Sequence, residues 1–481
     1  MSLPLKESNP RDLCLHINTA TPLGGLFEGD RANLHPDSRL PWRISPEPFW
    51  LTPVQHQFLI DLGPTLLAFY RASNLLYQQS VRGIQPAWVH QYLDRGKPQQ
   101  IVEFGRMNRF KTQVPPVIRP DLLLTEEGFR VTELDSIPGG IGFTAHLSGL
   151  YADLGYDLVG GGDGLVTGFY EALQTSTRLE KPAVAIVVSD ESDTYREEMQ
   201  WLAQQLHDRD LPVYCRHPSD VHFDEEGLFI IEGNESVRLD AIYRFFELFD
   251  LKNIPKAEPI TYFAKKNAVR LAPPLKAYLE EKMWLALLHH PLLRQYWDKE
   301  LGRQQRTLLA EVVPQSWILD ATAIPPHAVI PGLEIGGSPV NNWDCLKDLT
   351  KKGRELVVKP SGFSEDAQHS RGVSIGHDLP EEVWADRVQA ALDQFDSGPY
   401  ILQQFHKAAR VTGRYYDFYK DEVRPMRGRA LLRPYYYVVG DEAKLAGIQS
   451  ILCPPDKKLL HGMIDAVLTP CAVAEDVGQD G

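Results

Sequence analysis

Residues 121–135 read DLLLTEEGFRVTELD, with two apolar runs on either side of a turn that contains a glycine. Such a pattern predicts a β-hairpin. With a three-residue turn, the carboxylate of Asp121 lies directly across the hairpin from that of Glu133. Side chains two positions apart on a strand share a face, so Asp135 points the same way as Glu133. The stretch therefore predicts that three carboxylates converge.

Three carboxylates held close together repel one another unless a cation neutralises them. Hard oxygen ligands without Cys or His suit Mg²⁺ or Mn²⁺, and Mg²⁺ held in this way usually carries substrate phosphates as well. We therefore expect Asp121, Glu133 and Asp135 to bind metal. Arg119 is two residues before Asp121 and on the same face, where it could hold an anion that the metal also binds. The alternative interpretation is a solvated acidic strand edge.

Composition narrows the class of protein. The chain has 481 residues, 43% of them hydrophobic, so it can bury a large core divided over two or three domains. Its formal net charge is −14 and no Lys/Arg cluster is long enough to follow a phosphate backbone, so nucleic acid is not an expected partner. There is no signal-peptide pattern and no apolar window near 18 residues, which predicts a cytoplasmic protein without membrane contact. The five cysteines show no C-x-x-C spacing, which disfavours both a disulfide framework and a zinc site.

Hydrophobic periodicity organises the rest of the chain. It predicts helices over 53–80, 144–154 and 165–174, and a β-α-β pattern formed by strand 183–188, helix 195–207 and strand 212–215, followed by a strand at 241–245. The predicted divisions are an N-terminal wrap (1–50), a metal-binding part of the core (51–175), a Rossmann-like layer (176–255), a lysine and flap lobe (256–410), a return to the core (411–473) and a disordered tail (474–481).

Two lysines follow the hairpin in sequence. Lys282 lies within an apolar run, 275–288, that predicts a helix, so its ammonium group needs an anion or must extend along the helix edge to water. Lys359 ends the predicted strand 356–359, and Pro360 should stop the ladder there.

The loop 361–372 after that strand is longer than a usual hairpin loop and is rich in Gly and Ser, with Ser361 and Gly362 at its start. It predicts a flap over phosphates, with a plain surface hairpin as the alternative. The strand 400–405 would supply Gln403 and Gln404, whose amides could read an adenine.

These features together describe an ATP-grasp nucleotide site in which the acids precede the lysines, so the order is circularly permuted. In that order the chain resembles the glutathionylspermidine synthetase-like, circularly permuted ATP-grasp family. The resemblance rests on IRPDLLLTEEGFRVTELDSIPGG (118–140), LEEKMWLALLHHPLLRQYW (279–297), ELVVKPSGFSEDAQHSRGVSIG (355–376) and YILQQF (400–405). It implies a mixed α/β (α+β) fold, namely a circularly permuted ATP-grasp with a Rossmann-like pre-ATP-grasp layer.

The resemblance also implies roles for single residues. Asp121, Glu133 and Asp135 would bind two Mg²⁺, Lys282 and Lys359 would contact the ATP phosphates, and Arg119 would act on the phosphoryl group in transfer. Two departures stand out. Asp135 replaces the family's usual Asn, and the segment 445–451, where a second catalytic arginine is expected, has Gln449 and Ser450 instead. Substitutes for that arginine would be Arg427, Arg429 or Arg433.

The function that follows from the resemblance is an ATP-dependent carboxylate–amine ligase. It would form an amide through an acyl phosphate and release ADP and phosphate, with a small-molecule carboxylate and amine as substrates. Arg244, at the end of strand 241–245, and Arg429 are candidate substrate contacts, although Arg244 could equally be a strand-end arginine with no such role. The alternatives are an ATP-dependent phosphotransferase and a non-catalytic nucleotide-binding accessory protein. The sequence gives no indication of oligomeric state.

Overall fold

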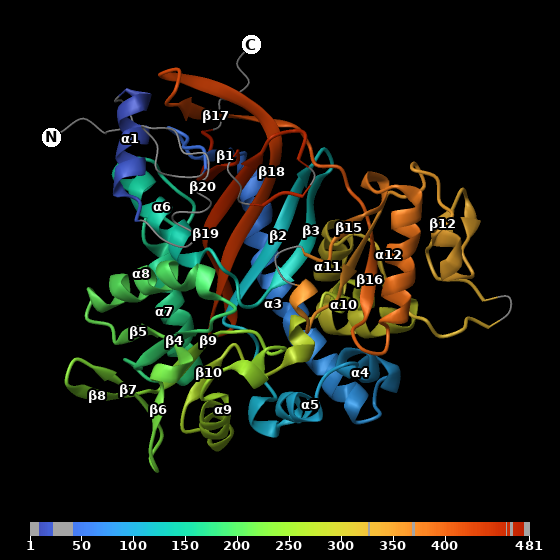
Figure 1. Cartoon of the computed structure of the whole chain (residues 1–481), viewed down its shortest axis with the longest axis horizontal. Coiled ribbons are helices and arrows are strands. Elements are labelled where there is room, and N and C mark those ends of the chain that lie inside the picture. Colours follow the sequence, from blue (N-terminus) through green and yellow to red (C-terminus); the bar gives the residue numbers. More distant parts are fainter. Residues whose placement is uncertain are drawn as a thin grey trace.

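The computed structural model describes residues 9–22, 42–325, 328–367, 371–457, 459–461 and 465–475. Most of the predicted tail and parts of the predicted N-terminal wrap and flap therefore lie outside the described residues. The fold is mixed α/β, with three main sheets and helices packed around them (Figure 1). None of the described helices is long and apolar enough to cross a membrane.

The largest sheet is built from both ends of the chain, in the order β1-β20-β19-β18-β2-β3, and β17 adds to it by pairing with the first residues of β18. Its strands are β1 (Phe49–Leu51), β2 (Val117–Thr125), β3 (Gly128–Asp135), β17 (Val411–Asp417), β18 (Glu422–Val439), β19 (Glu442–Cys453) and β20 (Val467–Val473). The hairpin β2–β3 therefore pairs with a strand about 300 residues later, through Leu431 opposite Leu123.

Two groups of helices cover the two faces of this central sheet. On one face, α3 (Pro53–Val81) packs with Leu122, Leu432 and Tyr436. On the other face, α6 (Ile141–Asp153) packs with Leu431, and α7 (Gly164–Thr177) packs with Tyr435 and Tyr437. Because side chains alternate along a strand, Arg119, Asp121 and Arg433 share the face on which α6 and α7 lie. This face holds the cavity described below.

The hairpin corrects one detail of the sequence prediction and confirms its consequence. The turn has two residues, so Thr125 pairs with Gly128 and not with Phe129. That register alone would turn Glu133 to the core face, beside Val131. A β-bulge between Asp121 and Leu122 places one extra residue in β3 and sets Asp121 opposite Glu133 after all.

The Rossmann-like layer is a four-stranded parallel sheet in the order β10-β9-β4-β5. It comprises β4 (Val184–Val188), α8 (Arg196–His207), β5 (Val213–Arg216), β9 (Ala241–Phe245) and β10 (Arg270–Ala272). A small antiparallel sheet of β6 (His222–Phe223), β7 (Leu228–Glu232) and β8 (Glu235–Arg238) lies between β5 and β9 in sequence.

The third sheet, in the order β11-β16-β14-β15, carries Lys359 and the predicted hinge strand. Its strands are β11 (Ser316–Leu319), β14 (Leu356–Pro360), β15 (Ser374–Ile375) and β16 (Tyr400–Gln404), accompanied by α10 (Met283–His289), α11 (Arg294–Val312) and α12 (Glu381–Asp393). The strand and its ladder end at Pro360, which pairs with Tyr400, so the strand is one residue longer than predicted. Lys282 is not inside a helix: it occupies the N-cap position of α10.

The remaining elements are helical or short. They are α1 (Pro10–Ala20), α4 (Ala87–Asp94), α5 (Gln99–Arg106), α9 (Ala257–Lys266), β12 (Glu334–Ile335) and β13 (Ser338–Pro339). Within the predicted N-terminal wrap, α1 is an ordered helix. Its side chains Leu13, Cys14 and Ile17 are buried in a hydrophobic cluster that also contains residues of α6.

Candidate functional site

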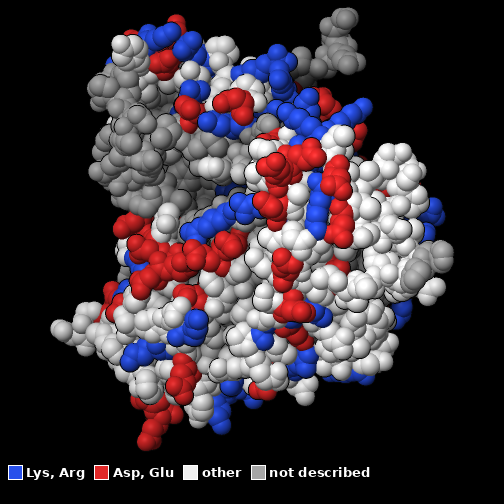
Figure 2. All heavy atoms as spheres, turned by 45° about the vertical axis from the view of Figure 1, so that its right-hand side comes forward, with Lys and Arg blue, Asp and Glu red and all other residues white. Residues whose placement is uncertain are grey.

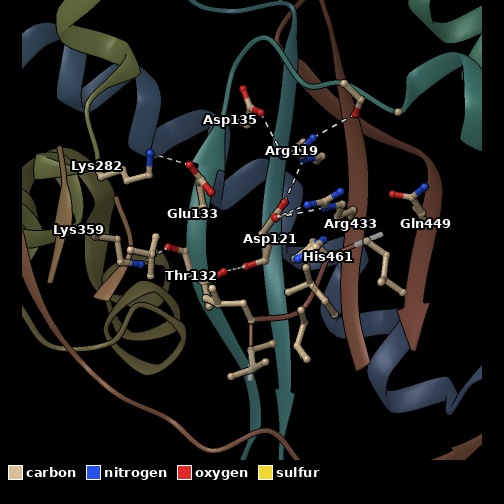
Figure 3. Close-up of a pocket in the computed structure, with 18 of the residues that line it drawn as sticks. Arg119, Asp121, Thr132, Glu133, Asp135, Lys282, Lys359, Arg433, Gln449 and His461 are labelled. Atoms are coloured by element: carbon tan, nitrogen blue, oxygen red, sulfur yellow. Dashed lines mark hydrogen bonds and ion pairs between the residues drawn. The ribbon is translucent and has the colours of Figure 1, made fainter. Parts of the chain in front are cut away.

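A cavity of about 790 Å³ lies between the central sheet and the sheet that carries Lys359. Its wall combines charged side chains from β2, β3, β14 and β18 with the residue that precedes α10 (Figure 3). Eight predicted site residues line it, namely Arg119, Asp121, Glu133, Asp135, Lys282, Lys359, Gln403 and Gln404. Figure 2 shows basic and acidic side chains mixed over the described surface of one face, without a continuous basic track.

Asp121 is held between two arginines. Its Oδ1 lies 3.0 Å from Nε of Arg119, and its Oδ2 lies 3.0 Å from Nη2 of Arg433. Burial raises the pKa of the Asp121 carboxyl, but the two guanidinium groups outweigh burial and hold this pKa below its usual value. Arg119 also pairs with Asp135 at 3.0 Å and donates to the carbonyl oxygen of Gly139 at 3.1 Å.

Glu133 and Lys282 form a further ion pair of the cavity. Nζ of Lys282 lies 2.7 Å from Oε1 of Glu133 and donates to the carbonyl oxygen of Ala367 at 2.9 Å. Burial would lower the pKa of Lys282, but the Glu133 carboxylate outweighs it and the pKa is raised. Burial raises the pKa of Asp135.

Lys359 has neutral partners. Its Nζ donates to the carbonyl oxygen of Thr132 at 2.9 Å and to Oε1 of Gln403 at 2.8 Å. Burial lowers the pKa of Lys359 to about 8; Glu133 opposes this shift and Lys282 adds to it. Within the described part of the chain no carboxylate pairs with this ammonium group, so it is placed to meet an anion from outside the chain.

Ser361 and Gly362 do not line the cavity but fix the start of α10. The backbone of Ser361 accepts from Lys282 N at 2.7 Å, and its hydroxyl accepts from Met283 N at 3.0 Å and donates to the Glu281 carboxylate. A Cβ on Gly362 would come within 2.9 Å of the carbonyl oxygen of Glu280. These contacts set the position of Lys282.

The two candidate substrate arginines lie outside the cavity wall. Arg244 is fully buried, donates to the carbonyl oxygen of Phe246 at 2.7 Å and pairs with Glu280. Arg429 donates to the carbonyl oxygen of Lys457 at 3.0 Å. Both contacts tie parts of the protein together, and neither arginine faces the cavity.

Four residues that line the cavity were not assigned a role in it from the sequence, or only as one of several candidates: Arg433, Gln449, Glu191 and Glu247. Arg433 was only one of three candidates for a missing arginine, yet it alone of the three lines the cavity, directly across the ladder from Gln449. Oε1 of Gln449 is buried without a hydrogen-bond partner among the described residues. Two further carboxylates, Glu191 and Glu247, also line the cavity, and burial raises the pKa of Glu247 to about 8. Their sequence neighbourhoods carry no motif, so only the folded arrangement identifies them.

The donor set suits Mg²⁺ by its chemistry, because Asp121, Glu133 and Asp135 offer only carboxylate oxygens. In the conformation described, each of these acids faces a cation, and no group of three His, Cys, Asp or Glu side chains among the described residues is arranged around one point as metal ligands would be. Metal binding at these acids therefore requires that some of the present ion pairs be exchanged.

No family model matches the chain, and no curated protein matches its sequence. Its fold is similar to that of a solved glutathione synthetase-like effector from Globodera pallida in apo form, with a TM-score of 0.55 and 11% identity over 98% of this chain and 100% of that one. A candidate gamma-glutamylcysteine synthetase from Methylobacillus flagellatus aligns with a TM-score of 0.40 and 13% identity over 87% of each chain, which is too weak to carry an argument. The first likeness confirms the predicted mixed α/β fold and extends to the fold alone.

Proposed function

We propose that this protein is an ATP-dependent carboxylate–amine ligase with a circularly permuted ATP-grasp site of the glutathionylspermidine synthetase-like kind. One observation carries the proposal. A single cavity gathers lysines, arginines and carboxylates from segments that are far apart in the sequence, among them Lys282, Lys359, Arg119, Arg433, Asp121, Glu133 and Asp135. Such a mixture suits a polyphosphate, a metal ion and a carboxylate better than it suits any one of them.

The two ends of the cavity suit different parts of the reactants. Lys359 and Lys282 would bind the ATP phosphates, and the Gln403 and Gln404 amides, beside the apolar side chains of Val357 and Ile375, would contact the adenine. Arg433 and Arg119 lie on the central sheet, on the far side of Glu133 from Lys359 (Figure 3). They would hold the carboxylate substrate and the phosphoryl group between them.

In the first step, a carboxylate oxygen of the substrate attacks the γ-phosphorus of ATP, the bond from that phosphorus to the β-γ bridging oxygen breaks, and ADP leaves. In the second step, the amine nitrogen attacks the acyl carbon, the bond to the phosphate oxygen breaks, and the amine loses a proton. Arg119 and Lys282 would stabilise the charge on the transferring group. Mg²⁺ bound by Asp121, Glu133 and Asp135 would supply further neutralisation of the phosphate charge.

The test is incubation with ATP, Mg²⁺ and pooled small carboxylates and amines, followed by mass spectrometry. An amide product with ADP supports the ligase. A phosphorylated metabolite without amide would indicate a phosphotransferase, and the absence of any ATP turnover would indicate an accessory protein.

A matched pair of variants locates the activity. Glu133→Gln removes one cavity carboxylate at nearly constant volume and should abolish Mg²⁺-dependent ATP turnover. Glu127→Gln, on the exposed turn of the same hairpin and outside the cavity, should leave turnover unchanged. Normal turnover by Glu133→Gln would refute the site assignment.

A further inference from the structure

The face of the central sheet beside Arg433 carries an apolar row. Leu431 pairs with Ile451 across β18 and β19, Ile451 pairs with Leu468 across β19 and β20, and all three line the cavity. Arg433 is two residues from Leu431 on the same strand, so their side chains share a face about 7 Å apart along the strand. A cationic position and an apolar platform are therefore neighbours on one surface.

Two aromatic side chains and one leucine complete the chamber over this platform. The rings of Trp42 and Phe143 meet edge to face with centroids 5.5 Å apart, and both line the cavity. Leu460 lines it from the segment between β19 and β20. We define the apolar chamber as Trp42, Phe143, Leu431, Ile451, Leu460 and Leu468.

The chamber lies at the end of the cavity away from the nucleotide residues. Lys359 and Gln403 belong to the sheet that contains β14 and β16, whereas the row Leu431, Ile451 and Leu468 belongs to the central sheet. Figure 3 shows Lys359 on one side of Glu133, and Arg433 and Gln449 on the other. The chamber is therefore not needed for the adenine.

We infer that the carboxylate substrate carries an apolar body, aliphatic or aromatic, which fills the apolar chamber while its carboxylate meets Arg433. This inference rests on the proposed ligase function and names the class of acid. Burial of apolar surface favours such an acid, whereas a polar body would lose its hydration against Leu431 and Ile451.

The experiment uses the full chain with ATP, Mg²⁺ and hydroxylamine, which converts an acyl phosphate into a hydroxamate without the natural amine. The acids are 3-phenylpropionate and hexanoate, compared with glutarate and 3-aminopropionate. We expect kcat/KM for the two apolar acids to exceed that for the polar pair at least about tenfold, which is the scale of discrimination by an apolar pocket. Polar acids that react equally well or better would overturn the inference.

Variants test the chamber itself. Leu460→Gln places an amide at its half-buried rim, where the fold tolerates a polar group, and should lower the preference for apolar acids several-fold while KM for ATP stays unchanged. Leu431→Thr should do the same from within the sheet, and Leu292→Gln, on an exposed site outside the cavity, should have no effect. A preference that survives both chamber variants counts against the inference.

Calorimetric titration of 3-phenylpropionate and glutarate in the presence of a non-hydrolysable ATP analogue separates the two proposals. Preferential binding of 3-phenylpropionate without any hydroxamate would uphold the chamber and refute the ligase. Hydroxamate formed from glutarate alone would uphold acyl phosphate formation and refute the inference about the chamber. If neither acid binds, the inference that the apolar chamber holds the body of the substrate is refuted directly.

Discussion

Asp121 has two tasks that compete at the level of a single side chain. Both of its oxygens are engaged by arginines, so a metal ion at this carboxylate must displace Arg119 or Arg433 or share an oxygen with one of them. The arginine that the metal ion displaces is then free to bind a substrate anion. We therefore expect the loss of Arg433 to slow the chemical steps while nucleotide binding is largely kept.

We predict that Arg433→Met lowers kcat for amide or hydroxamate formation about 100-fold, the cost of removing one preorganised donor from a developing anion. The affinity for ATP should change by no more than a few-fold, because Arg433 lies away from Lys359 (Figure 3). Steady-state kinetics and nucleotide titration measure the two effects. Arg429→Met is the matched control, since Arg429 lies on the same strand but outside the cavity. Equal effects of the two substitutions would contradict the assignment.

The pH dependence of ATP binding should report on Lys359. Burial lowers the pKa of Lys359 from 10.5 to about 8, so this lysine is charged below about pH 8 and loses its proton as the pH rises through that value. Bound phosphates favour the charged form, so the affinity for ATP should be greatest below pH 8 and should decline above it. Fluorescence titration between pH 6.5 and 9.5 measures this; these limits span about 1.5 units on either side of the lowered pKa.

Lys359→Gln provides the control for the pH experiment. It should bind ATP more weakly at pH 7 and show a flatter profile, because the titrating group is gone. Lys282 does not titrate in this range, since its pKa is raised. A wild-type profile as flat as that of Lys359→Gln would show that Lys359 is not the phosphate-binding lysine.

The sequence was sufficient to predict that Asp121 pairs with Glu133, but it did not predict the β-bulge that produces this pairing. The predicted three-residue turn and the observed two-residue turn with a bulge give the same partner for Asp121. Alternation of apolar residues indicates that two strands pair, but the bulge depends on what the two faces contact. Here Val131 packs in the hydrophobic core on one face of the strand, and Glu133 lines the cavity on the other.

At the level of elements, the junction of α6 and α8 positions the backbone that Arg119 contacts. The buried Glu198 of α8 accepts from the N–H groups of Gly140 at 2.6 Å and Phe143 at 2.8 Å, at the start of α6. This holds Gly139, whose carbonyl oxygen receives Arg119, in place. Burial raises the pKa of Glu198 to about 7.

We predict that Gly142→Ala destabilises this junction. A Cβ at Gly142 would lie 2.2 Å from the carbonyl oxygen of Glu198, so α6 and α8 must move apart, at a cost of about 1–3 kcal/mol. Gly149→Ala in the same helix is the control, because its Cβ would meet only Gly162 O at 3.8 Å; it should be neutral or slightly stabilising. Urea unfolding of both variants measures the difference. A Gly142→Ala protein as stable as Gly149→Ala would contradict the close contact.

Elements with strong local signals were predictable, and those governed by distant partners were not. Helix α3 was predicted over 53–80 and is observed at Pro53–Val81, with a Thr52–Gln55 capping box. The predicted helix over 275–288 is α-helical only from Met283 onward, after a short 3-10 helix at Ala277–Glu280. One reason is Lys276, whose buried ammonium group donates to Asn74 and to the carbonyl oxygens of Lys111 and Gln113, all far away in sequence.

At the scale of the whole molecule, contacts between the central sheet and the lysine-bearing lobe bring the two walls of the cavity together. Lys282 pairs with Glu133, and Lys359 donates to the carbonyl oxygen of Thr132, so β3 of the central sheet faces the lysine-bearing lobe. Sequence patterns within each sheet contain no information about this juxtaposition, because it arises from packing between segments about 150 to 230 residues apart. A ligand that bridges both lysines and the hairpin should strengthen the same connection.

We therefore predict that ATP with Mg²⁺ stabilises the entire chain. Binding at 100 times Kd adds about 2.7 kcal/mol, which corresponds to a rise in Tm of a few degrees for a protein of this size. Differential scanning fluorimetry with increasing ATP should show this rise, and EDTA should reduce it. Glu127→Gln should respond like the wild type, whereas Lys359→Gln should lose most of the response, since the ammonium group that would contact the phosphates is gone. A wild-type Tm that does not depend on millimolar ATP would mean that the cavity is not a nucleotide site.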